Sequence, residues 1–504
     1  MGKRAFLPPL GLITVAALLP ESWDLRLVDC AVREPSEGDW AWAELVLLTG
    51  MIVQRDQMLD LLREAEERGV PVAMGGPFVT SVPDLFDEAG ADYLILGEGE
   101  TVIPDLIAHL GTYGVRRREG PALRFDGTAH KPDVTLTPLP RFDLLEMDAY
   151  LSMSVQYSRG CPFLCEFCDI ITLYGRRPRT KTPDQLVAEL DLLHGLGWRG
   201  DVFVVDDNFI GNRPNVRKML PSLLIWQEAH GFPFEFFTEA SIDMAGDPDL
   251  MRMMVRCGFR TVFVGIETPD EESLTLTLKR QNTREPMTDS IARITAAGLR
   301  VTCGMILGFD GEKQGAGDRI VQFMEETAIP TVTITILQAL PNTALWDRLI
   351  KEGRLGGGAA GMGQDQICNF TPTRPVGEIV AEYVDAYRRL YDRPGYLRRA
   401  GRHFSRLGQG AGAAPRPLLD TSFPDRIRGA IGLTKIATFL LCARPARRPF
   451  LGALIRVLAH NPGRVEDFLN VCVQLEHFGA IAERVARELD GKNMQEKEYE
   501  FGAP

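Results

Sequence analysis

Ser158-Arg159-Gly160-Cys161-Pro162-Phe163-Leu164-Cys165-Glu166-Phe167-Cys168 is the stretch from which the fold of this chain can be inferred. Its three cysteines fall within eight residues and are spaced C-x3-C-x2-C. They follow the apolar run Met153–Tyr157, which predicts a strand that ends at the cysteine loop. Three thiolates on one short loop can hold three irons of a [4Fe–4S] cluster. Because no fourth cysteine follows closely, the fourth iron would stay open to bind and activate another molecule.

Other uses of Cys161, Cys165 and Cys168 fit the spacing less well. A structural zinc site needs four ligands, usually from two closely spaced pairs, and the sequence has no second pair. Disulfide frameworks are typical of short secreted chains with many clustered cysteines. We therefore favour an iron–sulfur site with these three cysteines as ligands, with zinc or redox-active thiols as the alternatives.

The totals describe a long, acidic chain of ordinary composition. A chain of 504 residues is longer than a single hydrophobic core usually accommodates, so two or three domains are expected. A net charge of -12 argues against a general nucleic-acid binder, because phosphate neutralisation needs a basic surface. Scattered single cysteines fit a reducing compartment, and no apolar run approaches the roughly 20 residues of a membrane span. We expect a cytoplasmic protein.

Residues 1–135 alternate short apolar runs with helical patterns, which is typical of a doubly wound α/β domain. The predicted strands are Leu25–Asp29, Leu45–Thr49, Val70–Met74 and Tyr93–Leu96, and the predicted helices are Gln54–Arg68 and Pro83–Ala89. Glycines follow two of these strands, in the segments Gly75-Gly76-Pro77 and Gly97-Glu98-Gly99. At a strand end, glycine permits close approach of the backbone to a ligand, although glycines there are also common turn formers.

Residues 136–151 form a proline-punctuated linker, and residues 152–352 repeat a strand–helix pattern six times. The expected strands are Met153–Tyr157, Val202–Asp206, Glu235–Thr238, Thr261–Ile266, Val301–Leu307 and Thr331–Leu337. Parallel strands with helices outside predict either a barrel or an open (β/α)6 partial TIM barrel, and in both the functional groups belong at the carboxyl ends of the strands.

Residues 353–504 are predicted to be mainly helical, with helices at Val376–Asp392, Ile427–Leu441, Phe450–His460 and Val465–Leu489. Between residues 424 and 464, arginines recur among large apolar residues. This pattern fits peripheral contact with an anionic membrane, but ordinary helices packed on the barrel with solvated arginines account for it better.

Polar and glycine residues follow the predicted barrel strands. They are Asp206, Asp207 and Asn208, then Glu239, then Glu267, and finally Gly304 and Gly308. The alternative for the acidic and amide side chains is a helix N-cap, a position that Asp and Asn favour. A basic turn, Tyr174–Lys181, soon follows the cysteines and would either meet an anionic group or remain a solvated loop.

The cysteine spacing, with the aromatic Phe167 before the last cysteine, resembles the radical S-adenosylmethionine (SAM) superfamily. The resemblance implies that the open iron chelates the amino and carboxylate groups of SAM. It also implies SAM-binding roles for Phe167, Asp206, Asp207, Asn208, Glu239, Glu267, Gly304 and Gly308. Asp206–Asn208 takes the place of the family's amino-binding motif, Glu267 that of a ribose ligand, and Gly304–Gly308 that of an adenine-binding segment.

The amino-terminal half adds a second resemblance. Together with the cysteines, Pro8–Leu12, Asp29, Gly75–Pro77 and Gly97–Glu100 resemble the Rossmann-like cobalamin-binding domain of B12-dependent radical SAM enzymes. This implies cobalamin contacts from Gly75, Gly76, Pro77, Gly97, Glu98 and Gly99. In two respects the sequence departs from the family: the strand expected before Pro8 is missing, and no Asp-x-His-x-x-Gly motif offers cobalt a histidine.

The segments Cys161–Ile171, Val205–Asn212 and Leu337–Trp346 are similar to the hopanoid C-2 methylase group. This resemblance implies methylation of an unactivated carbon through a 5′-deoxyadenosyl radical and methylcobalamin. Its partners would be a small-molecule or lipid substrate and an external reductant such as flavodoxin or ferredoxin. Two alternatives remain open: a B12-binding radical SAM cyclase or ring-rearranging enzyme, and a non-catalytic electron carrier or cobalamin sensor. A carrier would need four cysteines around its cluster.

Overall fold

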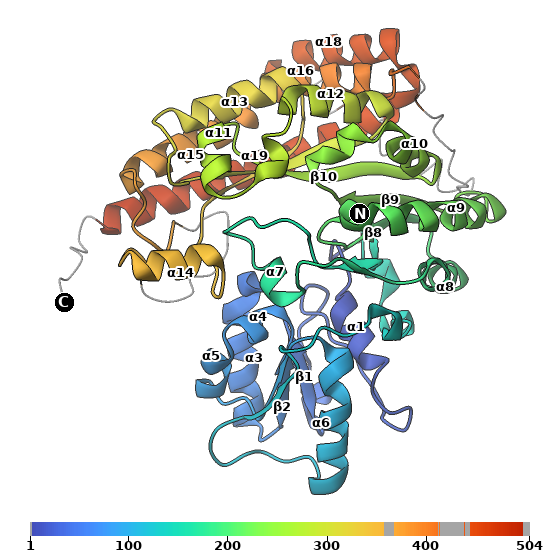
Figure 1. The fold of residues 1–504 in the computed structure, drawn as a ribbon, viewed down its shortest axis with the longest axis vertical. Helices are drawn as coiled ribbons and strands as arrows, with labels where there is room; N and C mark the ends of the chain where they lie inside the picture. Colours follow the sequence, from blue (N-terminus) through green and yellow to red (C-terminus); the bar gives the residue numbers. More distant parts are fainter. Residues whose placement is uncertain (1–2, 357–366, 412, 414–437, 439–443, 497–504) are drawn as a thin grey trace. The chain divides into compact units, whose positions relative to one another are not determined.

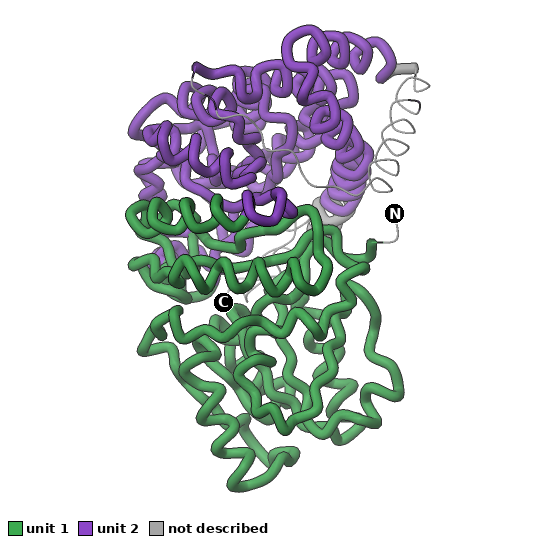
Figure 2. The backbone as a smooth tube through the Cα atoms, turned by 90° about the vertical axis from the view of Figure 1, so that its right-hand side faces the viewer, with its two compact units in different colours: residues 1–162, 168–226, 341–343 green, residues 163–167, 227–340, 344–504 purple. Residues whose placement is uncertain are grey.

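The computed structural model describes residues 3–356, 367–411, 413, 438 and 444–496 (Figure 1). The chain divides into two compact units (Figure 2). Unit 1 comprises residues 1–162, 168–226 and 341–343, and unit 2 comprises residues 163–167, 227–340 and 344–504. Among the described residues, no helix combines the length and apolarity needed to cross a bilayer.

Unit 1 begins with a four-stranded sheet whose neighbouring strands are all parallel, in the order β1-β2-β3-β4. The strands are β1 (Val46–Thr49), β2 (Val72–Gly75), β3 (Tyr93–Leu96) and β4 (Leu123–Asp126). The helices are α1 (Leu10–Ala16), α2 (Glu37–Trp42), α3 (Arg55–Glu67), α4 (Pro77–Ser81), α5 (Pro83–Glu88) and α6 (Gly99–Tyr113).

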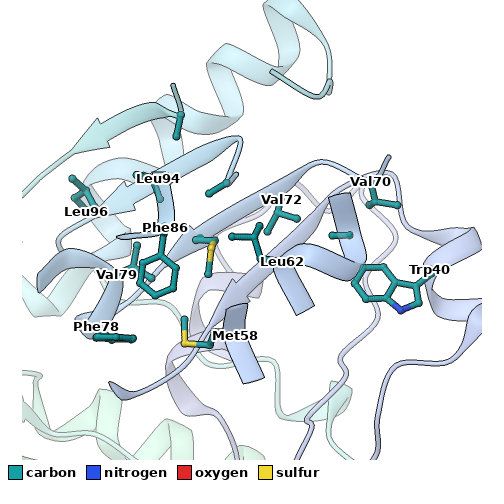
Figure 3. Packing of buried hydrophobic residues seen from close by; sticks show 14 residues of the cluster. Trp40, Met58, Leu62, Val70, Val72, Phe78, Val79, Phe86, Leu94 and Leu96 are labelled. Atoms are coloured by element: carbon teal, nitrogen blue, oxygen red, sulfur yellow. The ribbon is translucent and has the colours of Figure 1, made fainter. Parts of the chain in front are cut away.

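Alternate side chains of the central strands enter two different cores, so both faces of this sheet are covered. Val72 and Met74 of β2 pack with Leu62 of α3 and Phe86 of α5 in one core (Figure 3). Ala73, between them in the sequence, packs with the helix α6 in the other core. Burial on both faces explains the continuous apolar runs of these strands and confirms the doubly wound domain.

One predicted strand of this domain is wrong, and one strand was missed. Leu25–Asp29 contains no strand; Leu25 packs partly buried against the core beneath α6. An apolar run can be buried in an irregular segment, and periodicity alone does not show that a ladder forms. The missed strand, β4, alternates half-buried and exposed residues over only four positions, which gives little sequence signal.

Unit 1 also contains the first strands of the strand–helix repeat. The parallel strands β5 (Met153–Val155) and β8 (Gly200–Val204) pair with each other. Between them, β6 (Ser158–Arg159) pairs antiparallel with β7 (Arg179–Thr180), a pair that the sequence pattern did not predict. The helices here are α7 (Ile170–Leu173), α8 (Pro183–Gly195) and α9 (Arg213–Ala229).

Unit 2 contains four parallel strands in the order β12-β11-β10-β9. They are β9 (Phe234–Glu239), β10 (Phe259–Glu267), β11 (Arg300–Leu307) and β12 (Val332–Ile336). The helices α10 (Pro248–Arg256), α11 (Glu271–Leu276), α12 (Met287–Ala297), α13 (Ala316–Thr327) and α14 (Ala344–Lys351) accompany them. All six strands predicted for the repeat are therefore present, four in this unit and two in unit 1.

The rest of unit 2 is helical, as expected, with α15 (Val376–Leu390), α16 (Arg393–Arg406), α18 (Arg444–His460) and α19 (Val465–Glu496). The predicted helix Ile427–Leu441 lies outside the described residues apart from Thr438. The sequence missed α16, whose fully buried Arg399 donates to the carbonyl oxygens of Ile329 and Leu390. The bond to Ile329 attaches the helix to the segment before β12, and an ion pair with Glu325 compensates the buried charge.

Candidate active site

The cysteine loop turns sharply at Gly160. Its φ of 96° lies in the left-handed region, and a Cβ there would lie 2.7 Å from the carbonyl oxygen of Gly175. The Gly160 N–H donates to Asp207 Oδ2 at 3.1 Å, and the Cys161 N–H donates to the Gly175 carbonyl at 3.2 Å. Only glycine fits this turn, which places Cys161 beside the residues that follow β8.

Amide N–H groups face two of the three cysteines. Asn208 Nδ2 lies 3.9 Å from Cys161 Sγ, and Gln281 Nε2 lies 3.5 Å from the buried Cys165 Sγ. The described residues contain no ready-made group of three or more metal-ligating side chains, so the thiols are not gathered into a ligand set. Three thiols on one loop, with amide donors beside two of them, nevertheless fit a [4Fe–4S] cluster that leaves one iron open.

Two adjacent carboxylates follow β8. Asp206 is fully buried and accepts from the Tyr157 N–H at 2.8 Å and the Ser158 hydroxyl at 2.6 Å. Burial raises the pKa of Asp206 to about 7, although these donors oppose the shift. Burial also raises the pKa of Asp207 to about 6. Both groups are therefore easier to protonate than an ordinary aspartate.

The N-cap alternative does not account for Asn208, the residue before a short 3-10 helix at Phe209–Asn212. Its side chain makes no capping hydrogen bond to that helix. Instead the amide points to Cys161, as described above. Asp207 likewise accepts from the cysteine loop, through Gly160. The structure thus brings Asp206, Asp207 and Asn208 together with the start of the loop.

The predicted SAM-binding residues of unit 2 lie at or near strand ends. Glu267 ends β10 with a φ of 67° and forms an ion pair with Lys279. Gly304 lies within β11, where a Cβ would lie 3.1 Å from the Phe263 ring and 3.9 Å from Glu267 Oε2. Gly308, just after β11, has a φ of 95°, and its N–H donates to Glu312 Oε2 at 2.6 Å.

Phe167 and Glu239 complete the predicted SAM set. The Phe167 ring centroid lies 5.6 Å from that of Phe309, which follows β11, and Lys279 Nζ lies 5.7 Å from the Phe167 centroid. Glu239 is the last residue of β9. Phe167, Glu267 and Lys279 are thus neighbours, and SAM contacts from this set remain a prediction.

The glycines predicted to bind cobalamin are packed against the chain itself. A Cβ on Gly75 would lie 3.2 Å from the Ile95 Cβ, and one on Gly76 would lie 2.3 Å from Thr49 Oγ1. One on Gly97 would lie 3.0 Å from the Gly127 carbonyl carbon. Internal packing and a positive φ are thus enough to require glycine at Gly76 and Gly97, and they leave little room for a side chain at Gly75.

The other predicted cobalamin residues belong to helix starts. Pro77 is the first residue of α4, and Gly99 is the first residue of α6, where a Cβ would lie 3.2 Å from Val15 Cγ2. Glu98 precedes α6, and its carboxylate is already bound by two arginines. Direct cobalamin contacts from these residues remain a prediction.

Unit 1 contains an arginine–carboxylate network that the sequence pattern did not predict. Arg159, two residues before Cys161, pairs with Glu98 at 2.8 Å and with Glu100 at 2.8 Å. Arg179 of the basic turn pairs with Glu98 at 2.7 Å, so this arginine is not a solvated loop residue. Burial opposes ionisation of Glu100, but Arg159 outweighs it and lowers the pKa of Glu100 to about 2. The network ties the end of β3 to the cysteine loop.

The fold and the cysteine loop define a radical SAM protein with an amino-terminal cobalamin-binding domain. Residues 4–107 match the B12 binding domain family, and residues 155–324 match the Radical SAM superfamily. Residues 343–491 match a domain of unknown function, DUF4070.

Two relatives specify the group further. The chain is 52% identical over 496 residues to an uncharacterized methyltransferase of Synechocystis sp., covering 97% of this chain and 89% of that protein. It is 42% identical over 395 residues to the hopanoid C-2 methylase of Rhodopseudomonas palustris, covering 78% of this chain and 73% of that protein. The chain therefore belongs to the cobalamin-dependent radical SAM methyltransferases.

Solved structures share the fold at low sequence identity. The radical SAM methyltransferase TsrM from Kitasatospora setae, with cobalamin and [4Fe–4S] cluster bound, has a TM-score of 0.60 at 18% identity, covering 76% of this chain and 84% of TsrM. The cobalamin-dependent radical enzyme OxsB has a TM-score of 0.60 at 15% identity, covering 99% of this chain and 80% of OxsB. These comparisons confirm the predicted fold class, in which a cobalamin-binding domain and a radical SAM domain are joined in one chain.

Membership in this family also settles the class of activity and the cofactors. The protein is an enzyme that uses a [4Fe–4S] cluster, SAM and cobalamin, as the sequence analysis expected. An electron carrier or a cobalamin sensor is therefore excluded, and methyl transfer is favoured over cyclisation.

Proposed function

We propose that this enzyme methylates an unactivated carbon of a hopanoid or a similar apolar, polycyclic lipid. The observation that carries the proposal is the 42% identity to the hopanoid C-2 methylase over 395 residues. The 52% identical Synechocystis protein carries the name of a methyltransferase without a stated substrate, so it is compatible with this choice.

The surroundings of Phe167 support an apolar substrate. Phe167, Trp346 and Cys368 are partly exposed and pack against a buried apolar cluster that includes Phe309 and Leu337. Phe167 lies between two cluster cysteines in the sequence, so this apolar surface adjoins the cysteine loop. Apolar surface gains about 25 cal/mol per Å² when it is removed from water, which favours binding of a hydrocarbon.

The chain's own residues hold and orient the reacting molecules in this proposal. Cys161, Cys165 and Cys168 hold the cluster, and Asp207 and Glu267 belong to the groups that orient SAM. Asn208 directs an amide N–H toward Cys161 Sγ, and Gln281 directs one toward Cys165 Sγ. When bound, the cluster, SAM and cobalamin supply one-electron radical chemistry and a transferable methyl group. The partly buried apolar side chains near Phe167 exclude water from the substrate carbon.

Two further partners belong to the proposal. An external one-electron donor such as flavodoxin or ferredoxin reduces the cluster. A lipid substrate also favours peripheral contact with a membrane through residues 424–464, of which the structure describes 438 and 444–464. In that part, α18 exposes Ile455 and Leu458 together with Arg448 and Arg456.

The proposal is tested with anaerobically reconstituted protein that holds its cluster and cobalamin. SAM, a strong reductant and a hopanoid hydrocarbon are added, and lipid and nucleoside products are analysed by mass spectrometry. We expect a singly methylated hopanoid together with 5′-deoxyadenosine. The matched control replaces Cys161, Cys165 and Cys168 with alanine, which should abolish both products because the cluster is lost.

The two products separate the possible failures. Release of 5′-deoxyadenosine without a methylated hopanoid would contradict the substrate and leave the enzyme class intact. A rearranged product of unchanged mass would contradict methyl transfer and favour a ring-rearranging enzyme.

A further inference from the structure

The second cluster cysteine is attached to a turn that the sequence analysis did not single out. The Glu166 N–H donates to the Thr277 carbonyl at 3.1 Å, and Gln281 Nε2 lies 3.5 Å from Cys165 Sγ. Gln281 belongs to a short 3-10 helix at Arg280–Asn282, which follows β10 and α11. Two consecutive residues of the cysteine loop therefore rest on residues 277–281.

This turn is fixed to the end of β10. Asn282 Nδ2 donates to the carbonyl oxygens of Gly265 at 3.0 Å and Ile266 at 2.9 Å, and Lys279 forms its ion pair with Glu267. The Gln281 side chain is 5% exposed, so it does not swing into solvent. The amide donor is thus held in a defined position against Cys165.

The orientation of the Gln281 amide matches an ionised sulfur. Its Nε2 faces Cys165 Sγ, whereas its buried Oε1 has no hydrogen-bond partner among the described residues. A thiolate only accepts hydrogen bonds, so it favours the N–H end of an amide, whereas a neutral thiol would also donate to the oxygen end. Iron ligation requires the thiolate form of the cysteine.

We propose that Gln281 is a positioning residue that makes the cluster easier to reduce, by donating a hydrogen bond to the Cys165 thiolate. A hydrogen bond to a cluster sulfur stabilises the reduced cluster more than the oxidised one, because the reduced cluster carries one more negative charge. The electron comes from the external one-electron donor. Gln281 touches a cluster ligand and takes no part in bond making.

The test is the midpoint potential of the cluster in reconstituted holoprotein, followed by electron paramagnetic resonance in an anaerobic redox titration. Gln281→Leu and Gln281→Met both remove the donor and keep an apolar side chain of similar size. We expect each to lower the equilibrium constant for one-electron reduction by about tenfold. That change corresponds to a midpoint potential about 59 mV more negative.

Gln227 provides a matched control. It is a fully buried glutamine whose Nε2 donates to the carbonyls of Phe234 and Cys257, and its Oε1 also lacks a partner among the described residues. Gln227→Leu should lower stability and leave the midpoint potential unchanged.

Three results would overturn the proposal. The first is an unchanged potential in a Gln281 variant that holds its cluster. The second is an equal shift in Gln227→Leu. The third is that neither Gln281 variant gives a folded protein that retains its iron, as measured by circular dichroism and iron analysis. The residue would then serve stability or cluster retention, and it would not tune the midpoint potential.

Discussion

Asp206 is a carboxylate whose environment favours its neutral form. It is fully buried after β8, and burial raises its pKa to about 7. Because the folded pKa lies above that of the unfolded chain, protonated Asp206 stabilises the fold at acidic pH. This contribution is lost as pH rises from the unfolded value near 4 through about 7.

The substitution Asp206→Asn removes this titration. When the pH rises from 5 to 8, the free energy of unfolding of the natural protein should fall by about 2 kcal/mol relative to that of the variant, because only the natural protein loses the contribution of protonated Asp206. Anaerobic urea unfolding at the two pH values, followed by circular dichroism, measures the difference. The control is Asp60→Asn, whose side chain is 68% exposed. Parallel pH profiles for Asp206→Asn and the natural protein would contradict a raised pKa.

The elements β6 and β7 are held more by side chains than by their backbone ladder. Their antiparallel pair spans only two residues on each strand. Arg159 of β6 and Arg179 of β7 both pair with Glu98, whose side chain is 3% exposed. These contacts link the strand before the cysteine loop to the start of α6.

Breaking this network should therefore destabilise the loop. Glu100→Gln leaves the guanidinium of Arg159 only partly compensated, at a cost of about 3 kcal/mol, as for other buried pairs that lose one partner. We also expect faster loss of cluster iron, because Arg159 precedes Cys161 by two residues. Urea unfolding and the rate of iron release to a chelator measure the two effects.

The exposed pair of Arg63 with Asp60 is the control for this experiment. Asp60→Asn should cost less than about 0.5 kcal/mol, because solvent screens exposed pairs. If Glu100→Gln and Asp60→Asn lower the free energy of unfolding equally, the network does not stabilise the loop.

At the scale of the whole molecule, the proposed lipid substrate requires that this acidic protein has a local surface that tolerates an anionic membrane. The helix α18 exposes 63% of Ile455 and 51% of Leu458, and its exposed charges, Arg447, Arg448 and Arg456, are basic. Exposed apolar residues beside arginines suit the interface between headgroups and acyl chains.

Replacing both Ile455 and Leu458 with serine should weaken binding to phosphatidylglycerol-containing vesicles by about tenfold, because the apolar insertion is lost. Co-sedimentation of the holoprotein with vesicles measures this. The control is Ile225→Ser on α9, which removes an apolar side chain that is 69% exposed. If neither the natural protein nor the control binds vesicles, the peripheral contact is wrong.

Local sequence patterns were enough to predict the cofactors and most of the strands. The spacing of Cys161, Cys165 and Cys168 is enough to predict a cluster-binding loop, because three cysteines within eight residues belong to one short loop. The six strands of the barrel repeat could be predicted because each is a short, mostly apolar run between helical patterns, and in β9, β11 and β12 every second residue is buried. Short strands could not be predicted in this way, and β4 and the β6–β7 pair were missed. The apolar segment Leu25–Asp29 was predicted to be a strand but is irregular.

The side chains that surround the cysteines could be identified only from the packed structure. Gln281 and Cys165 are 116 positions apart, and Arg159 and Glu98 are 61 positions apart. A glutamine in a short helix or a glutamate beside a glycine gives no local signal of such a contact. Periodicity and spacing report only on near neighbours in the chain, whereas these contacts arise when packed elements bring distant residues together.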